Sequence, residues 1–456
     1  MLLAVVLLVF VVLGAWVHWR YKNRKLLEIS KKIPGPPTIP ILGNALYFMC
    51  RPEEMIKITK ELIKEYGSIL RFWLGPDLNI VVSNPDDIKI LLTNNKVSVK
   101  GPQYKYMSDL IGVGILSGSG SKWRKHRKVV IPNYGKRAVE SYNDVCYREA
   151  EILVDNLYKV HQDGVQDIYK HIVKTTSYIV CQSLMGFTRD ETSRIPCLQN
   201  VIDESPRKEA LKNINEDDLE LLNSEQDSMR NTKLSVIDRL ILSQELNDKE
   251  LIEETFTLFT SSQEATAKIT SFLLLMMAYH PKCQDELYSE ILNVIGNNHG
   301  PIIEDDLKRM PYLEKCYKEV LRLYPIGVML QRTVTDDVEI STCTLPAGSS
   351  LVIPIFNLHR DPRFWEDPEA FDPERFSTEN TKKRNPFCYI PFSLGPMDCL
   401  GRFLAGKFIK TIAITVLREF RLSSINEYKD LNVIMAISAK SANGYPVVLT
   451  PRQQCN

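Results

Sequence analysis

Residues 391–406, with the sequence PFSLGPMDCLGRFLAG, restrict the fold more than any other part of the chain. Gly395 and Gly401 permit a tight loop around Cys399, and the residues from Arg402 onward have the character of a long helix. A helix that begins beside a cysteine stabilises the thiolate through its dipole. Backbone donors of such a loop can also hydrogen-bond the sulfur of a thiolate that binds a metal. A lone cysteine near glycines is most often a structural thiol, so this interpretation needs support from other segments.

The first residues predict a membrane anchor. From Leu2 to Trp19 the only polar side chain is His18, and a basic cluster follows from Arg20 to Lys25. About 18 apolar residues just span the hydrocarbon layer as a helix, and basic charges beyond them favour the cytoplasmic side. A cleaved signal peptide is the alternative, but this run is longer than a usual h-region and its charges follow it. We therefore predict a signal-anchor over residues 1–20, with the rest of the chain in the cytosol.

Three further features describe the body of the chain. Residues 21–40 predict a basic, proline-rich hinge, because the PGPP sequence at 34–37 cannot continue a helix. The ten cysteines form no CxxC pair, which fits reduced thiols in a cytosolic compartment. A net charge of +1 gives no reason to expect a nucleic-acid partner.

The local patterns predict a mainly helical protein with small β-sheets. Residues 69–74 and 80–82 are β-rich runs on either side of a Gly-Pro-Asp turn and predict a hairpin, and the SNPDD sequence at 83–87 predicts a helix start. Long helices are predicted over residues 251–279, from 281, over 310–323 and over 402–420, and short strands over 338–340 and 351–356. The absence of βαβ alternation excludes the doubly wound nucleotide-binding folds.

The cysteine loop is similar to the haem loop of the cytochrome P-450 monooxygenases, whose pattern is F-x-x-G-x-R-x-C-x-G. Phe392, Gly395, Cys399 and Gly401 match this pattern, and Met397 stands where the arginine should be. The chain resembles the fatty-acid-hydroxylase-like clan in the segments KWRKHRK, VIPIFNLHRDP and FDPERF.

Further motifs occur in the family's order. The EVLR sequence at 319–322 resembles the E-x-x-R of a buried helix, and the PERF sequence at 373–376 resembles the segment that completes its ion-pair triad. We therefore predict that Glu319 and Arg322 are buried partners of Arg375. The alternative is an exposed i,i+3 pair, which contributes only a few tenths of a kcal/mol, roughly 0.2–0.5.

The sequence WRKHR at 123–127 resembles the W-x-x-x-R helix that binds the haem propionates. By this resemblance Trp123 and Arg127 bind the propionates, and Arg332 takes the position of a further propionate arginine. An amphipathic surface helix and a strand-edge charge are the corresponding alternatives. Four motifs in one order make coincidence very improbable.

The resemblance implies one haem domain over residues 41–456 that binds haem b (heme b, iron protoporphyrin IX) with Cys399 as the axial metal ligand. It implies a haem-thiolate monooxygenase that oxidises lipophilic small molecules with dioxygen and two electrons from an NADPH-dependent reductase. The expected location is the endoplasmic reticulum membrane, as a single-pass microsomal protein with its haem domain facing the cytosol.

One departure from the family falls on the long central helix. Aligning FTSSQEATA from Phe259 with F-x-A-G-x-D/E-T-T-A keeps the acid as Glu264, replaces the threonine by Ala265 and places Thr266 next. We predict that Glu264 and Thr266 order the water that supplies protons. An ordinary polar patch on a long helix is the alternative. Ser261 falls where members of the clan carry a glutamate that esterifies the haem, so no covalent haem link is expected.

Two other departures bear on activity. Met397 removes one cation from the propionate site, at an expected cost of about 1.5–3 kcal/mol. Residues 186–235 are much shorter than the family's usual stretch, which indicates either reduced roof helices over an open pocket or an incomplete gene model. Two alternative functions remain: a haem-thiolate isomerase or dehydratase without monooxygenation, which suits Ala265, and a degenerate, non-catalytic membrane-anchored member.

Overall fold

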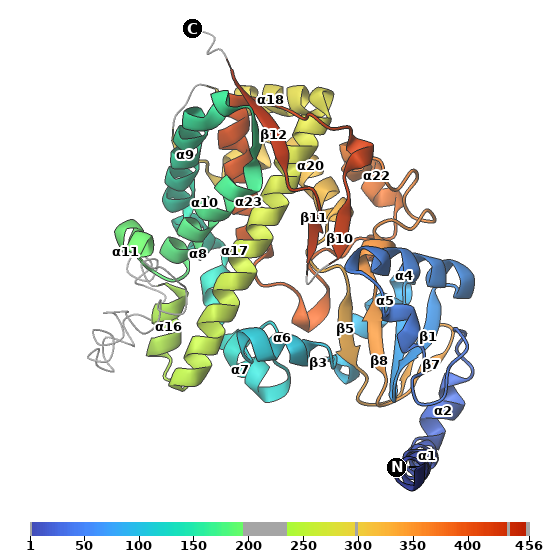
Figure 1. Cartoon of the computed structure of the whole chain (residues 1–456). Helices are drawn as coiled ribbons and strands as arrows, with labels where there is room; N and C mark the ends of the chain where they lie inside the picture. Colours follow the sequence, from blue (N-terminus) through green and yellow to red (C-terminus); the bar gives the residue numbers. More distant parts are fainter. Residues whose placement is uncertain (1, 195–234, 297–299, 436–437, 453–456) are drawn as a thin grey trace.

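The computed structural model describes residues 2–194, 235–296, 300–435 and 438–452, so the predicted shortening at 186–235 lies largely outside the described residues. Helices dominate the described part, and the strands form small sheets at its edges (Figure 1). The prediction of a mainly α fold with small β-sheets is confirmed.

The helices before the masked segment are α1 (Leu2–Lys22), α2 (Arg24–Ser30), α3 (Ala45–Phe48), α4 (Pro52–Tyr66), α5 (Pro85–Thr93), α6 (Tyr104–Ile111), α7 (Gly120–Val130), α8 (Lys136–Ser141), α9 (Asn143–Val160), α10 (Ile168–Ser183) and α11 (Arg189–Arg194). Those after it are α16 (Val236–Leu242), α17 (Asp248–Tyr279), α18 (Pro281–Ile295), α19 (Glu304–Lys308), α20 (Pro311–Leu323), α21 (Ile355–Leu358), α22 (Thr378–Lys383) and α23 (Arg402–Glu419). The strands are β1 (Ile69–Leu74), β2 (Asp77–Val82), β3 (Val99–Lys100), β4 (Val165–Asp167), β5 (Leu330–Thr333), β6 (Val338–Glu339), β7 (Thr344–Leu345), β8 (Ser350–Ile353), β9 (Phe420–Ser423), β10 (Val433–Met435), β11 (Ala439–Ser441) and β12 (Pro446–Pro451).

The N-terminal segment packs against the body at its C-terminal end. Trp19, near the end of α1, meets Trp73 edge to face with ring centroids 5.6 Å apart. The proline-rich stretch docks on β1, because the Arg71 N–H donates to the Pro34 carbonyl at 2.8 Å. Among the described residues, none of the helices combines the length and the apolar character needed to cross a membrane. The anchor over residues 1–20 therefore stays a prediction.

The largest sheet confirms the predicted hairpin. β1 and β2 pair antiparallel from Ile69–Val82 to Leu74–Asp77, and the strand order is β1-β2-β8-β5-β3. The helix start after this hairpin is also confirmed, since the Asn84 side chain accepts from the first backbone N–H groups of α5. The strand predicted over 351–356 is wrong at its end: β8 stops at Ile353, because Pro354 has no N–H for the ladder and α21 begins after it.

The main hydrophobic core lies around α17 and includes residues of α9, α10, α20 and α23. α17, which is 32 residues long, runs through the molecule beside α23, and the five-stranded sheet lies to its right in the view of Figure 1. Asn247 caps α17 by accepting from the Glu250 N–H, and this explains why the helix starts three residues before the predicted 251. The predicted ends of α20 and α23 agree with the structure to within a residue.

The predicted ion-pair triad is buried, as expected. Glu319 and Arg322 have no exposed surface, and two hydrogen bonds of 2.7 Å join the guanidinium to the carboxylate. Arg375 lies 3.4 Å from the same carboxylate. Arg322 also donates to the carbonyls of His359, Pro368 and Ala370, at 2.9, 2.7 and 3.0 Å. Burial raises the pKa of Glu319, and the hydrogen bond and charge of Arg322 oppose this effect.

Replacing Glu319 with alanine is expected to lower the free energy of unfolding by about 3–5 kcal/mol, because it leaves the Arg322 charge buried without its partner. Urea-induced unfolding followed by circular dichroism measures this change. The matched control is Glu374→Ala, which breaks the more exposed 2.8 Å pair with Lys315 and should cost about 0–1 kcal/mol. Equal losses in the two variants would contradict a special role for the buried triad.

Candidate functional site

The cysteine loop is a tight turn that docks on α5. Residues Gly395–Met397 form a short 3-10 turn, and α23 begins at Arg402, three residues after Cys399. Gly395 has φ +76°, and a Cβ at this position would lie 2.2 Å from the Leu92 carbonyl oxygen, so only glycine fits. Gly401 has φ −79°, which any residue adopts, so the loop's conformation requires glycine at only one of the two predicted positions.

Backbone hydrogen bonds set the position of Cys399. Its N–H donates to the carbonyl of Phe392 at 2.9 Å, and the Phe392 ring packs against the main hydrophobic core. The loop is also tied to the buried triad, because the Ile390 N–H donates to Nε2 of His359 at 2.9 Å. Burial and the charges of Arg322 and Arg360 lower the pKa of His359 to about 3, so its ring is neutral and accepts this bond.

Cys399 differs from the other cysteines that the structure describes. It is the one whose side chain is exposed, whereas the other seven are buried or half-buried. Even so, protein atoms around the sulfur desolvate it, and this burial raises its pKa. A hydrogen bond from the Gly401 backbone and the charges of Arg127 and Arg402 act in the opposite direction. The thiol is therefore accessible yet surrounded by protein, with a backbone donor aimed at the sulfur.

The helix predicted to bind propionates lies against this loop. Arg127 of α7 donates to the main-chain carbonyl of Asp398 at 2.9 Å and to its carboxylate at 2.6 Å. The Arg127 guanidinium also lies 5.2 Å from the centre of the Trp123 ring. A second buried pair holds α7 to α17, since Nδ1 of His126 lies 2.5 Å from the fully buried Glu254 carboxylate. The sequence interpretation missed His126 and Glu254, which carry no motif signal of their own.

A cluster of cations surrounds the space near Cys399. Arg332 is 2% exposed, and within the described chain it has no carboxylate within ion-pair distance. Its neighbour across the β3–β5 ladder is Lys100, which the sequence interpretation also missed. Burial and the charges of Arg332 and Arg127 lower the pKa of Lys100 well below its usual value, while the thiolate of Cys399 opposes them.

These residues fit a haem group. Like charges directly opposite on neighbouring strands are destabilising, and a buried guanidinium without an acid costs several kcal/mol, on the order of 3–5. The described residues supply no carboxylate partner for Arg332 or Lys100, so an anionic group such as the two propionates of a haem would stabilise this pair. Cys399 lies close enough to Lys100 for their charges to interact, so a haem whose iron is held by this sulfur would lie next to the cluster. Met397, buried in the 3-10 turn, adds no charge to the cluster.

The predicted residues of α17 lie on different faces of the helix. Thr266 is 2% exposed and packs into the core, whereas Ala265 is half-buried. The Ser261 hydroxyl donates back to the Thr257 carbonyl of its own helix at 2.7 Å. Glu264 forms an ion pair with Lys268. The structure thus separates Thr266 from the face of residue 265, in agreement with the turn of about 100° per residue.

Tyr134 connects α17 with the cysteine loop. It is buried and hydrogen-bonded to Ser262, and burial raises its pKa. A Cβ on Gly401 would lie 3.9 Å from its ring. No motif of the sequence identified Tyr134, because its contacts join α17 and the cysteine loop, two segments that only the fold brings together.

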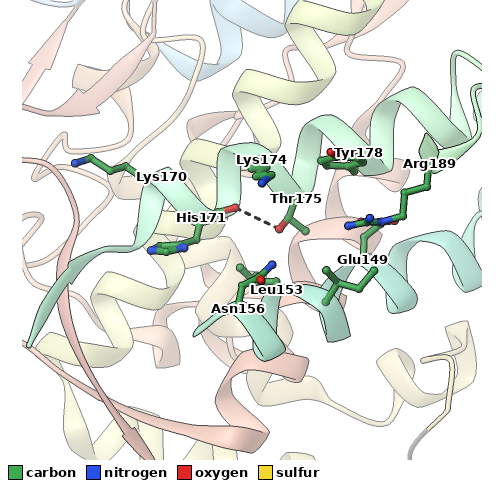
Figure 2. Close-up of a pocket in the computed structure, with 10 residues that line it drawn as sticks. Glu149, Leu153, Asn156, Lys170, His171, Lys174, Thr175, Tyr178 and Arg189 are labelled. Carbon is green, nitrogen blue, oxygen red and sulfur yellow. Dashed lines mark hydrogen bonds and ion pairs between the residues drawn. The ribbon is translucent and has the colours of Figure 1, made fainter. Parts of the chain in front are cut away.

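A separate cavity of about 320 Å³ lies between α9 and α10, and Figure 2 shows its polar lining. Glu149, which is buried, pairs there with Arg189 at 3.0 Å. None of the residues predicted to bind haem contributes to this lining.

Comparisons with known proteins agree with the geometry. A family model described as Cytochrome P450 matches residues 33–205 and 204–441. The chain is 27% identical to Cytochrome P450 4d1 of Drosophila simulans, over 92% of this chain and 93% of that protein. It is 27% identical to Cytochrome P450 4V2 of Rattus norvegicus, over 91% and 89% of the two chains, and 26% identical to Cytochrome P450 4c21 of Blattella germanica, over 93% and 94%.

The predicted family, and with it a haem b cofactor held by a cysteine thiolate, is confirmed. The matched segments include α7, the long α17, the buried triad and the cysteine loop. The chain belongs to the cytochrome P450 family.

Proposed function

We propose that this haem-thiolate monooxygenase binds its haem through Cys399 and oxidises lipophilic small molecules. The observation that carries the assignment is the accessible, backbone-bonded Cys399 thiol beside Arg332 and Lys100, for which the described residues supply no acid. Haem-dependent monooxygenase activity follows from the family. The isomerase or dehydratase alternative is not favoured by the family 4 relatives.

Each residue of the site has a proposed role. Arg127 and Arg332 pair with the haem propionates, and Trp123 packs against the Arg127 guanidinium. We add Lys100 to this set, because its position opposite Arg332 supplies a cation where Met397 supplies none. Phe392, Gly395 and Gly401 shape the loop that presents the sulfur: the first accepts the Cys399 N–H, the second permits the turn, and the third donates to the sulfur.

When bound, the haem iron activates dioxygen, and the thiolate donates electron density that favours cleavage of the O–O bond. The chain contributes orientation, exclusion of water and a supply of protons. We propose that Glu264 and Thr266 order the water for this supply. Thr266 is buried on a different face from residue 265, so it is a poor substitute for an alcohol at 265. Electron flow that forms peroxide or superoxide, with no product, is the expected consequence.

The finer assignments rest on the sequence. We propose that residues 1–20 are a single-pass anchor in the endoplasmic reticulum membrane, followed by a hinge over 21–40 and a cytosolic haem domain over 41–456. The electron donor proposed for this arrangement is an NADPH-dependent reductase.

Replacing Cys399 with alanine is expected to abolish the red-shifted Soret band of the reduced carbon monoxide complex, because this band requires a sulfur ligand. Difference spectroscopy of the purified protein measures it. Cys388→Ala is the matched control: Cys388 is a buried thiol at the start of the same region and should leave the band in place. A Cys399→Ala protein that keeps the band would contradict the ligand assignment.

Two substitutions are expected to separate proton supply from haem retention. Ala265→Thr restores the alcohol, so it should raise the amount of product formed per NADPH oxidised. Met397→Arg adds a cation to the propionate cluster, so it should slow haem loss to apomyoglobin without changing that ratio. Tight coupling in the unmodified protein, with product equal to NADPH consumed, would contradict the proposed defect.

Deleting residues 1–32 is expected to release much of the protein from membranes while its haem content is unchanged. The truncated chain keeps the buried Ile33 and the bond from Arg71 to Pro34, so the sheet retains its N-terminal support. Sedimentation with membranes and haem quantification give the two measurements. A truncated protein that sediments as fully as the intact one would contradict the anchor, and an apoprotein would place the N-terminus in the core.

A further inference from the structure

One polar cluster joins α17 to the C-terminal hairpin of β10 and β11. Glu264 and Lys268 lie one turn apart on α17, and Ser438 directly precedes β11. The Lys268 ammonium pairs with Oε1 of Glu264 and donates to the Ser438 hydroxyl at 2.5 Å. Ser438 in turn donates to the same Oε1 at 3.1 Å. Each of the three side chains therefore contacts the other two.

The burial of the three side chains is unequal. The side chain of Lys268 is 9% exposed and that of Glu264 is 44% exposed, and Ser438 is buried. An exposed i,i+4 pair would gain little from being held, because water screens the charges and both side chains lose rotamer freedom. Here a buried ammonium needs the carboxylate, because an unpaired buried cation is costly. The buried partners thus hold a carboxylate that would otherwise be mobile.

The groups that face Glu264 from neighbouring elements are aromatic. Tyr169 of α10 and Tyr445, which precedes β12, stack with ring centroids 5.4 Å apart. Burial is the main cause that raises the pKa of both, and the charge of Glu264 adds to it. Among the groups that these contacts place around the carboxylate, Lys268 is therefore the cation and Ser438 the hydroxyl donor.

We propose that Lys268 and Ser438 are positioning residues for Glu264: they fix the orientation of its carboxylate and tie the β10–β11 hairpin to α17 beside it. The proposal rests on the proposed function, in which Glu264 orders the water that supplies protons. Neither residue matches a motif of the sequence, and only the fold brings residue 438 to the helix.

The functional test uses the full-length holoprotein with its reductase and measures the ratio of peroxide released to product formed. Glu264→Gln and Lys268→Met should each raise this ratio by about three- to tenfold, the range that the loss of one net hydrogen bond gives. Lys268→Met should add nothing in the Glu264→Gln background, because the lysine acts through the carboxylate. Lys268→Arg should restore the ratio. The matched control is Lys410→Met, which removes another mostly buried lysine paired with a half-exposed glutamate.

A second measurement does not depend on the reaction. Amide hydrogen exchange in β10 and β11 should become faster in Lys268→Met and in Ser438→Ala, and should stay unchanged in Lys410→Met. Unchanged exchange in both variants would overturn the tie between the hairpin and α17, whether or not the protein holds haem.

The outcomes separate this proposal from the proposed function. If Glu264→Gln leaves the peroxide ratio unchanged, the role of Glu264 in proton supply is wrong, and with it the positioning role of Lys268. If Glu264→Gln raises the ratio and Lys268→Met does not, the role of Glu264 stands and the positioning proposal is overturned. A raised ratio in both, with restoration by Lys268→Arg, supports it.

Discussion

The buried pair of Glu319 and Arg322 is the constraint on which the rest of the site depends. Two charges without exposed surface persist only when every donor and acceptor has a partner, and Arg322 reaches three carbonyls besides the carboxylate. One of these carbonyls belongs to His359, whose neutral ring accepts the Ile390 N–H just before the cysteine loop. The pair therefore fixes α20 and the start of the loop together, and the sulfur position follows from both.

The cation cluster near Cys399 differs from the triad in its charge balance. Within the described residues, the chain provides Asp398 for Arg127 but no acid for Arg332, and it sets Lys100 opposite Arg332. Such an arrangement is unfavourable by itself, and the proposed placement of two propionates among the cations would make it favourable. With that placement, binding of haem would also stabilise the fold, because the group that binds the folded chain would neutralise its buried charge.

One departure from the family, Ala265, falls on the same turn of α17 as a held carboxylate. Ala265 removes an alcohol, and Lys268 and Ser438 engage the carboxylate of Glu264 that precedes it. In the proposed function both features act on the same property, which is the freedom of polar groups to supply protons. Met397 bears on another property, the charge balance around the proposed propionate site, where Lys100 is the cation that we propose to offset it.

The sequence by itself determined the fold class, the cysteine loop and the triad motif, because each depends on local pattern or on a motif of fixed spacing. The arginines of the propionate site stay a prediction of the same kind. The apolar pattern alone misplaced the end of β8 and the start of α17. These boundaries depend on Pro354 and on the Asn247 cap. Lys100, His359 and Ser438 were decided only by the tertiary structure. Lys100 lies opposite Arg332 through the strand register, the neutral ring of His359 accepts from Ile390, and Ser438 contacts Glu264 on α17. The two residues of each pair are more than 30 positions apart, and no spacing along the chain encodes such contacts.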